Sequence, residues 1–102
     1  MNEIEKFEKM RKELIIKNGK DDNLKDITKK WINTANKSEY SYNFSWLGRP
    51  IIQYPQDMIA MQEIIWDVKP DLIIETGIAH GGSLIFTASM LTLLEACGEI
   101  EN

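Results

Sequence analysis

Apolar residues recur at helical spacing in the first third of the chain and predict two helices there. Residues 3–17 place an apolar side chain at every third or fourth position, and Asn18-Gly19 then supplies a stop. This first stripe consists of Ile4, Phe7, Met10, Leu14 and Ile15. A second helix is predicted over about 22–35, where Leu24, Ile27 and Trp31 form the stripe. We therefore expect residues 1–36 to form an N-terminal helical segment.

A third helix is predicted over residues 56–68, after a stretch rich in serine, asparagine and aromatic residues. Pro55 suits the first helical position, and Asp57 favours the positive end of the helix dipole. The stripe of this helix consists of Met58, Met61, Ile65 and Val68. The aromatic stretch, 36–57, leaves two interpretations open. It is either a packed loop that covers a core edge, or part of a ligand pocket or subunit contact.

The pattern then changes to a strand, a glycine-rich turn and a fourth helix. The run "DLIIE", 71–75, is short and apolar, which is typical of a strand buried on both faces of a parallel sheet. After the glycines, residues 83–97 carry a broad apolar stripe that predicts a helix, and Gly98 stops it. Ser83 could serve as the N-cap of this helix.

One buried strand does not make a sheet, because a parallel strand needs neighbours on either side. We therefore expect an α/β protein whose N-terminal part is this chain of 102 residues, with helices preceding the sheet. In that interpretation residues 37–102 begin a larger domain that the chain does not complete. A helical mini-domain is the alternative.

Composition narrows the functional classes only slightly. Hydrophobic residues make up 43% of the chain and charged residues 27%, as in folded globular domains. The formal net charge of −4 does not favour a general nucleic-acid surface. Acidic and basic residues interleave over 3–20, which indicates a solvated helix face rather than a weak polyanion or membrane patch.

The cysteine count and the absence of long apolar runs bear on the cellular location. A single cysteine, Cys97, forms no internal disulfide and suits a reducing compartment, and we expect its thiol to be buried and inert. The first ten residues have no apolar core of a signal peptide, and no apolar run reaches the length of a membrane span. We therefore expect a cytoplasmic protein without a transmembrane segment.

The glycine turn, "ETGIAHGGS", is the candidate binding site. A strand, a glycine-rich turn and a helix form the usual cradle for a nucleotide-like ligand in α/β sheets. Two registers fit. Gly77 to Gly82 reads as G-x-A-x-x-G, a dinucleotide fingerprint in which the glycine that admits a pyrophosphate is missing. Glu75 to Gly81 reads as acidic-x-G-x-A-x-G, similar to the turn of class I S-adenosylmethionine-dependent methyltransferases. A close strand-to-helix turn without a ligand is the third interpretation.

The wider sequence resembles one family. The "WLGRPI" loop, the "P-x-D" helix start, "KPDLIIETG" and "HGGS" are similar to the cephalosporin hydroxylases and rhamnosyl O-methyltransferases over roughly residues 40–102. The resemblance implies a Rossmann-like fold that binds S-adenosylmethionine, and an enzyme that methylates a hydroxyl of a small molecule or of a glycan or glycolipid sugar. No nucleic acid is expected as a partner, and a homo-oligomer is possible.

Carried over by resemblance, the cofactor site lies in the glycine turn. The residues implied are Glu75, Thr76, Gly77, Ala79, His80, Gly81, Gly82 and Ser83. Glu75 would hold the ammonium of the methionine moiety. His80, the only histidine, is either beside the cofactor mouth or simply exposed, and Gln53 and Asp57 could face the same mouth. The resemblance also implies Mg²⁺, with its ligands and the catalytic base beyond residue 102, so this chain alone is expected to be inactive.

Two rival functions stay open at this point. The dinucleotide register would suit an NAD-type oxidoreductase. A non-enzymatic interaction module, in which the helical N-terminus and the aromatic stretch self-associate, would need no ligand at all.

Overall fold

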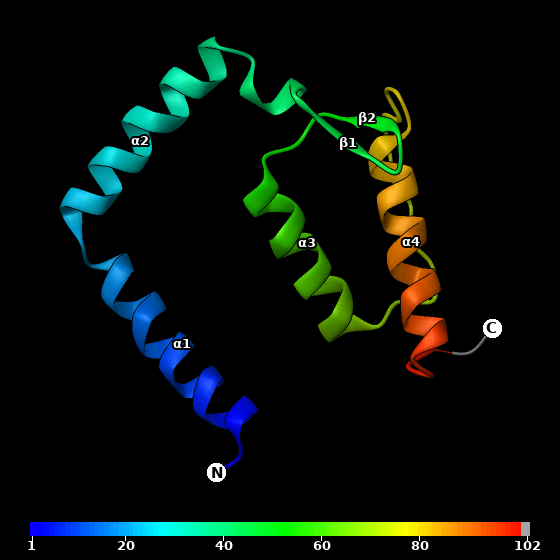
Figure 1. Cartoon of the computed structure of the whole chain (residues 1–102), viewed down its shortest axis with the longest axis horizontal. Helices are drawn as coiled ribbons and strands as arrows, with labels where there is room; N and C mark the ends of the chain where they lie inside the picture. The colour runs from blue at the N-terminus through cyan, green and yellow to red at the C-terminus, as the bar shows by residue number, and fades with distance from the viewer. Residues whose placement is uncertain (101–102) are drawn as a thin grey trace. The chain divides into compact units, whose positions relative to one another are not determined.

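The computed structural model describes residues 1–100, and the chain divides into two compact units (Figure 1). The first unit, Met1–Ser38, consists of α1 (Glu3–Gly19) and α2 (Asp22–Lys37). The second unit begins at Glu39 and holds the remaining elements. We call the first unit the arm. Both helices that the apolar periodicity predicts in the first third of the chain are confirmed.

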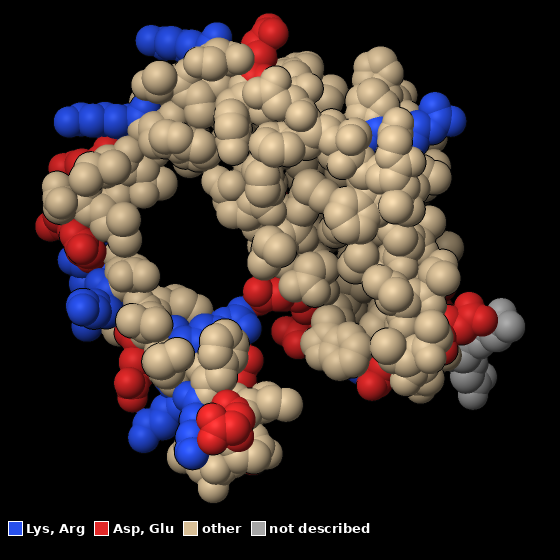
Figure 2. All heavy atoms as spheres, in the orientation of Figure 1, with Lys and Arg blue, Asp and Glu red and all other residues tan. Residues whose placement is uncertain are grey.

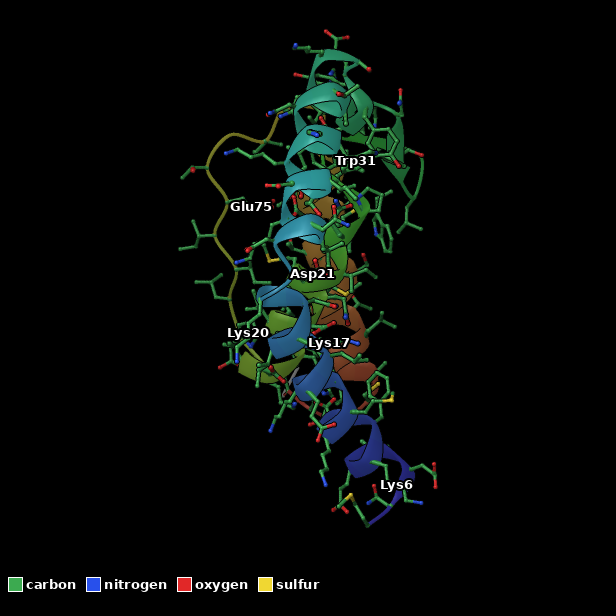
Figure 3. All side chains as sticks on the ribbon, turned by 90° about the vertical axis from the view of Figure 1, so that its left-hand side faces the viewer. Lys6, Lys17, Lys20, Asp21, Trp31 and Glu75 are labelled. Atoms are coloured by element: carbon green, nitrogen blue, oxygen red, sulfur yellow. The ribbon has the colours of Figure 1, made fainter. Side chains whose placement is uncertain are left out.

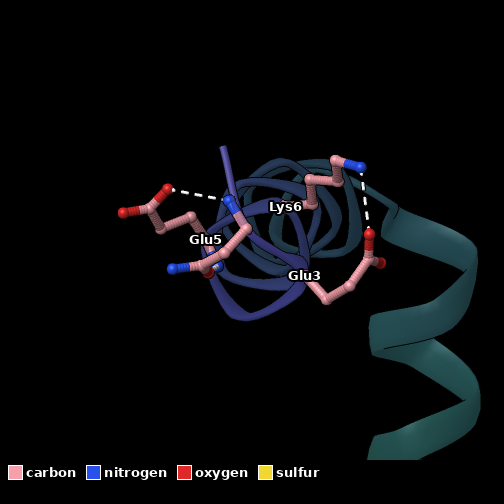
Figure 4. A network of polar contacts seen from close by, with 4 residues as sticks. Glu3, Glu5 and Lys6 are labelled. Carbon is pink, nitrogen blue, oxygen red and sulfur yellow. Dashed lines mark hydrogen bonds and ion pairs between the residues drawn. The ribbon is translucent and has the colours of Figure 1, made fainter.

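Local contacts at the helix starts stabilise the arm. The Asn2 side chain accepts a hydrogen bond from the Glu5 amide at 2.9 Å, and the Glu5 carboxylate accepts one from the Asn2 amide at 3.1 Å. Lys6 pairs with Glu3 at 3.0 Å beside this capping box (Figure 4). Asp21 caps α2 by accepting from the Leu24 amide at 3.0 Å. These bonds satisfy amides that have no partner within their own helix.

The apolar stripes of the arm are largely uncovered. Ala35 is the buried residue of α2, and α1 has none. Ile27 in the middle of the α2 stripe is 55% exposed. Caps and local pairs therefore contribute to the order of these helices.

The second unit opens with a short 3₁₀ turn, η1 (Tyr40–Tyr42), and a two-stranded antiparallel hairpin. Strand β1 (Phe44–Trp46) pairs with β2 (Arg49–Ile51), so that Phe44 faces Ile51 and Trp46 faces Arg49. Leu47 and Gly48 have φ values of 47° and 81°, as a two-residue turn between twisted strands requires.

The sequence did not predict this hairpin, although it lies in the aromatic stretch. The Tyr40 ring packs against Phe44 and Tyr54, with centroids 5.2 and 5.8 Å apart, which agrees with a packed loop.

Two helices complete the second unit, α3 (Pro55–Val68) and α4 (Gly82–Ala96). Both were predicted, and Pro55 takes the first position of α3 as expected. Ile65 from α3 and Leu94 from α4 are buried where the two helices meet. Among the described residues the fold is thus four helices with one two-stranded antiparallel sheet.

Helix α4 packs closely on the hairpin. The Trp46 ring meets Phe86 edge-on at 4.9 Å between centroids, and its indole N–H donates to Ser89 Oγ at 2.8 Å. Ile51 is only 2% exposed at the same contact. Gly82 permits the approach, since a Cβ there would overlap the Pro50 carbonyl oxygen and lie 2.7 Å from the Ile51 Cβ.

The predicted strand over 71–75 is wrong for this structure. Within residues 1–100 no other strand pairs with this segment, which runs from α3 to the glycine turn as extended chain. Leu72 and Ile74 are 73% and 79% exposed, while Ile73 and Glu75 are half-buried. The side chains therefore alternate as in a strand, but strand structure needs a partner to bond its backbone, and none of the described residues supplies one.

Cys97 also differs from expectation. It is the C-cap residue that directly follows α4, and it is exposed rather than buried. The end of α4 is closed by Gly98, whose φ of 73° confirms the predicted stop.

We expect Gly82→Ala to destabilise the second unit by about 1–3 kcal/mol, because the new methyl group must displace β2. The free energy of unfolding, from urea titration followed by near-ultraviolet circular dichroism, measures this effect. Gly19→Ala is the matched control, since a Cβ there meets nothing within 4 Å. Equal stability of the two variants would contradict the close contact.

The indole hydrogen bond gives a second test. Ser89→Ala leaves the Trp46 N–H without its acceptor, and we expect a loss of about 1–3 kcal/mol in the free energy of unfolding. Thr92→Ala removes an exposed hydroxyl that bonds only the Ala88 carbonyl, at 3.0 Å, and should change the stability by less than about 0.5 kcal/mol. Similar losses in both variants would mean that the indole bond contributes nothing.

Candidate functional site

The turn between the extended segment and α4 is built from alternating left-handed residues. Gly77, Ala79 and Gly81 have φ values of 79°, 50° and 83°. The Gly81 amide donates to the Ile78 carbonyl at 2.9 Å, which closes the turn around Ala79 and His80. These three positions are the ones that the acidic-x-G-x-A-x-G register assigns to glycine or its smallest substitute. Glycine adopts this conformation freely, whereas alanine does so at some cost.

Glu75 lies at the entry to this turn and is held by Ser83. The Ser83 hydroxyl donates to Glu75 Oε1 at 2.6 Å, a short bond of the kind that charged acceptors make. Figure 3 shows Glu75 on the extended segment that leads to the turn. The expectation that Ser83 caps α4 is wrong, because Gly81 occupies the N-cap position and no side chain caps the helix. The hydroxyl is directed to the carboxylate instead.

The second oxygen of Glu75 has no hydrogen-bond partner. Its Oε2 exposes less than 1 Å² to solvent. Among the described residues, it is the buried side-chain oxygen or nitrogen that lacks a hydrogen-bond partner. An acceptor that is buried and unpaired costs about 1–3 kcal/mol or more, so such an atom calls for a donor. A bound ligand with an ammonium or hydroxyl group would supply one.

An open pocket of about 270 Å³ adjoins the turn. It is lined by Arg49, Ile78, Ala79, His80, Gly81, Leu84 and Ile85. The α4 N-terminus contributes its first amides and partial positive charge to this region. Arg49 from β2 adds a guanidinium, a group suited to carboxylates and other anions. The sequence did not single out Arg49, and its only signal was a place inside the "WLGRPI" loop.

The predicted site residues fall into three groups. Ala79, His80 and Gly81 line the pocket, with His80 exposed as well. Glu75 and Ser83 are joined by their hydrogen bond, with the exposed Thr76 and Gly77 following Glu75.

The third group does not line the pocket. Gly82 is buried against β2. Gln53 and Asp57 are not among the lining residues either, and Asp57 lies in the first turn of α3, as a residue favoured by the helix dipole does.

Residues 1–100 hold no group of three or more histidine, cysteine, aspartate or glutamate side chains placed to bind a metal ion. No helix in the same range is long and apolar enough to cross a membrane.

Comparison with known proteins identifies the family. Residues 38–100 match the Rhamnosyl O-methyltransferase/CmcI family, so the match covers the hairpin, α3, the glycine turn and α4. No curated protein and no solved structure matches the chain. Because the family match spans more than half of the sequence and includes the whole turn, the chain belongs to the Rhamnosyl O-methyltransferase/CmcI family of methyltransferases.

Proposed function

We propose that the glycine turn is the methionine end of an S-adenosylmethionine site, and that the complete protein is an O-methyltransferase. The observation that carries this proposal is the Glu75 carboxylate, which holds Ser83 with one oxygen and leaves the other buried and unpaired. The ammonium of a methionine moiety has the charge and the donors that this oxygen lacks. The pyrophosphate of an NAD-type ligand has no donor to offer to a carboxylate, so such a ligand would have to satisfy this oxygen with a ribose hydroxyl or an amide, without the charge of an ammonium.

The backbone of the turn supports the same ligand. Left-handed residues at Gly77, Ala79 and Gly81 leave the backbone open on the ligand side, since a Cβ at either glycine would meet nothing within 4 Å. The Ala79 methyl group lies at the position where a dinucleotide turn carries the glycine that admits a pyrophosphate. S-adenosylmethionine has no pyrophosphate, so a methyl group there is tolerable.

The roles of the chain's own residues follow from this placement. Glu75 would orient the ammonium, Ser83 would fix the Glu75 carboxylate, and Arg49 would attract an anionic acceptor. S-adenosylmethionine supplies a methyl group on a sulfonium, which an acceptor hydroxyl takes up. The protein's contribution is to align the two reactants. His80 lines the pocket, and we assign no catalytic base among the described residues.

The substrate class follows from the family rather than from the pocket. We propose a small-molecule or sugar hydroxyl as the acceptor, and Mg²⁺ held by residues outside this sequence as an aid to its ionisation. The segment 71–75, with its unpaired backbone and alternating side chains, supports a Rossmann-like sheet completed by further strands. These strands would cover Leu72 and Ile74, which are exposed here.

Glu75→Gln tests the assignment directly. Glutamine keeps an oxygen for Ser83 but loses the negative charge, so we expect S-adenosylhomocysteine to bind about 10- to 150-fold more weakly, as for a lost charged hydrogen bond. The affinity is measured by calorimetric titration of the longest product of the reading frame, with NADH as comparator. Asp71→Asn is the matched control, because it removes an exposed carboxylate at the other end of the same segment. Equal affinity of both variants would refute the role of Glu75.

Ala79→Gly tests the conformation of the turn. Glycine relieves the left-handed strain at φ 50°, and we expect a gain of up to about 1 kcal/mol in the free energy of unfolding with unchanged affinity for S-adenosylhomocysteine. Ala88→Gly, in the exposed middle of α4, is the control and should lose about 1 kcal/mol. A loss of stability in both variants would show that Ala79 does not adopt the left-handed conformation.

A further inference from the structure

The pocket beside the glycine turn holds a basic side chain that the second unit leaves unpaired. Residues 39–102 hold two basic residues, Arg49 and Lys69, against nine acids. Lys69 pairs with Glu99 at 3.8 Å and donates to the Trp66 carbonyl at 2.7 Å. Arg49 lines the pocket and pairs with no acidic side chain among the described residues of this unit, 39–100. Its guanidinium is therefore available to an anionic ligand.

The charges of the second unit are also separated in space. Figure 2 shows basic atoms at the hairpin end of this unit, while the acidic atoms visible on it gather mainly at the far ends of α3 and α4. The hairpin end is the end at which β2 meets the first turn of α4. An anion that approaches the pocket thus meets the basic end of an otherwise acidic unit.

The hairpin fixes Arg49 on the face that packs against α4. Side chains of a strand alternate between two faces, so Arg49 and Ile51 of β2 share one face. Ile51 is 2% exposed, and a Cβ at Gly82 of α4 would lie 2.7 Å from its Cβ. Arg49 also pairs directly with Trp46, whose indole donates to Ser89 of α4. Arg49 is therefore positioned by packed neighbours on a strand, which suits a binding residue.

The rest of the pocket combines an apolar wall with a helix N-terminus. Ile78, Leu84 and Ile85 line the wall, and Ile78 is 54% exposed. No side chain caps α4, so the amides of its first turn keep their donors and add partial positive charge to that of Arg49. A ligand that matches this pocket of about 270 Å³ carries an anionic group next to an apolar carbon framework.

We propose that this pocket binds a carboxylate or phosphate group of the methyl acceptor, and that Arg49 is the residue that selects it. The inference rests on the proposed function, because it takes the glycine turn as the donor site and the adjoining pocket as the acceptor site. Ala79 and Gly81 belong to both, so an acceptor held in the pocket lies next to the donor. A guanidinium binds either anion through two parallel N–H donors, and Arg49 therefore orients the acceptor as well as attracting it.

Small anions test the pocket without knowledge of the whole acceptor. Butyrate and monobutyl phosphate are the probes, and n-butanol is the neutral analogue with the same alkyl chain. Amide chemical shifts of the longest product of the reading frame measure the binding. We expect saturable shifts at residues 78–85 with at least one of the anions, and binding of n-butanol that is at least about tenfold weaker. The tighter of the two anions distinguishes a carboxylate from a phosphate on the acceptor.

Substitution of Arg49 tests its role. Arg49→Gln should weaken binding of the anions at least about tenfold, and Arg49→Lys should retain only part of the affinity, because it keeps the charge without the two parallel donors. Lys69→Gln is the matched control, since it makes the same charge change at the other basic residue of the unit, and it should bind the anions like the wild-type protein. The affinity for S-adenosylhomocysteine should stay within about twofold in all three variants. Near-ultraviolet circular dichroism verifies their fold.

The outcomes separate this inference from the proposed function. If S-adenosylhomocysteine binds but n-butanol binds as well as the anions, or Arg49→Gln keeps the wild-type affinity for them, the inference is overturned and the proposed function stands. Arg49→Gln that weakens S-adenosylhomocysteine as much as the anions would also overturn it, because Arg49 would then belong to the donor site. If the anions bind through Arg49 and S-adenosylhomocysteine does not bind, the proposed function fails, whereas the assignment of an anion to Arg49 is supported.

Discussion

The close approach of α4 to the Pro50 carbonyl is the constraint on which the second unit depends. It requires a residue without a side chain at Gly82, and it fixes the first turn of α4 against the hairpin. The indole of Trp46 strengthens the same contact one and two helical turns further along, through Phe86 and Ser89. A helix held in this way presents its free N-terminal amides in a fixed direction, which is the condition for a preformed binding site. The contact between α4 and the hairpin therefore determines both the packing of the second unit and the direction of the α4 N-terminus at the turn.

The candidate site joins two segments, of which one is packed against the rest of the second unit and the other has few contacts that hold its backbone. Ser83 belongs to α4 and is held firmly, whereas Glu75 ends an extended segment whose backbone has no partner strand among residues 1–100. A single short hydrogen bond between them sets the position of the carboxylate. Further strands beside residues 71–75 would add a second restraint and bury Leu72 and Ile74.

The sequence predicted the features that depend on local chemistry. All four helices follow from apolar periodicity and from stops such as Gly98, and the glycine turn follows from residues that tolerate positive φ. Features that depend on distant partners were missed. The hairpin at 44–51 has strands of three residues, too short for a period-two pattern, and Arg49 reaches the pocket only through the packing of β2 on α4. The strand predicted at 71–75 failed for the same reason, since none of the described residues pairs with its backbone.

The most direct measurement is a residue-resolved titration of S-adenosylhomocysteine into the longest product of the reading frame, followed by amide chemical shifts. If the glycine turn holds the methionine moiety, the largest shifts will fall on the amides of residues 75–83, and Glu75 will respond together with Ser83. NADH at the same concentration will leave these amides unchanged. Saturable binding with shifts confined to other parts of the protein, or shifts at residues 75–83 caused by NADH alone, would contradict the assignment of this turn as a methyl-donor site.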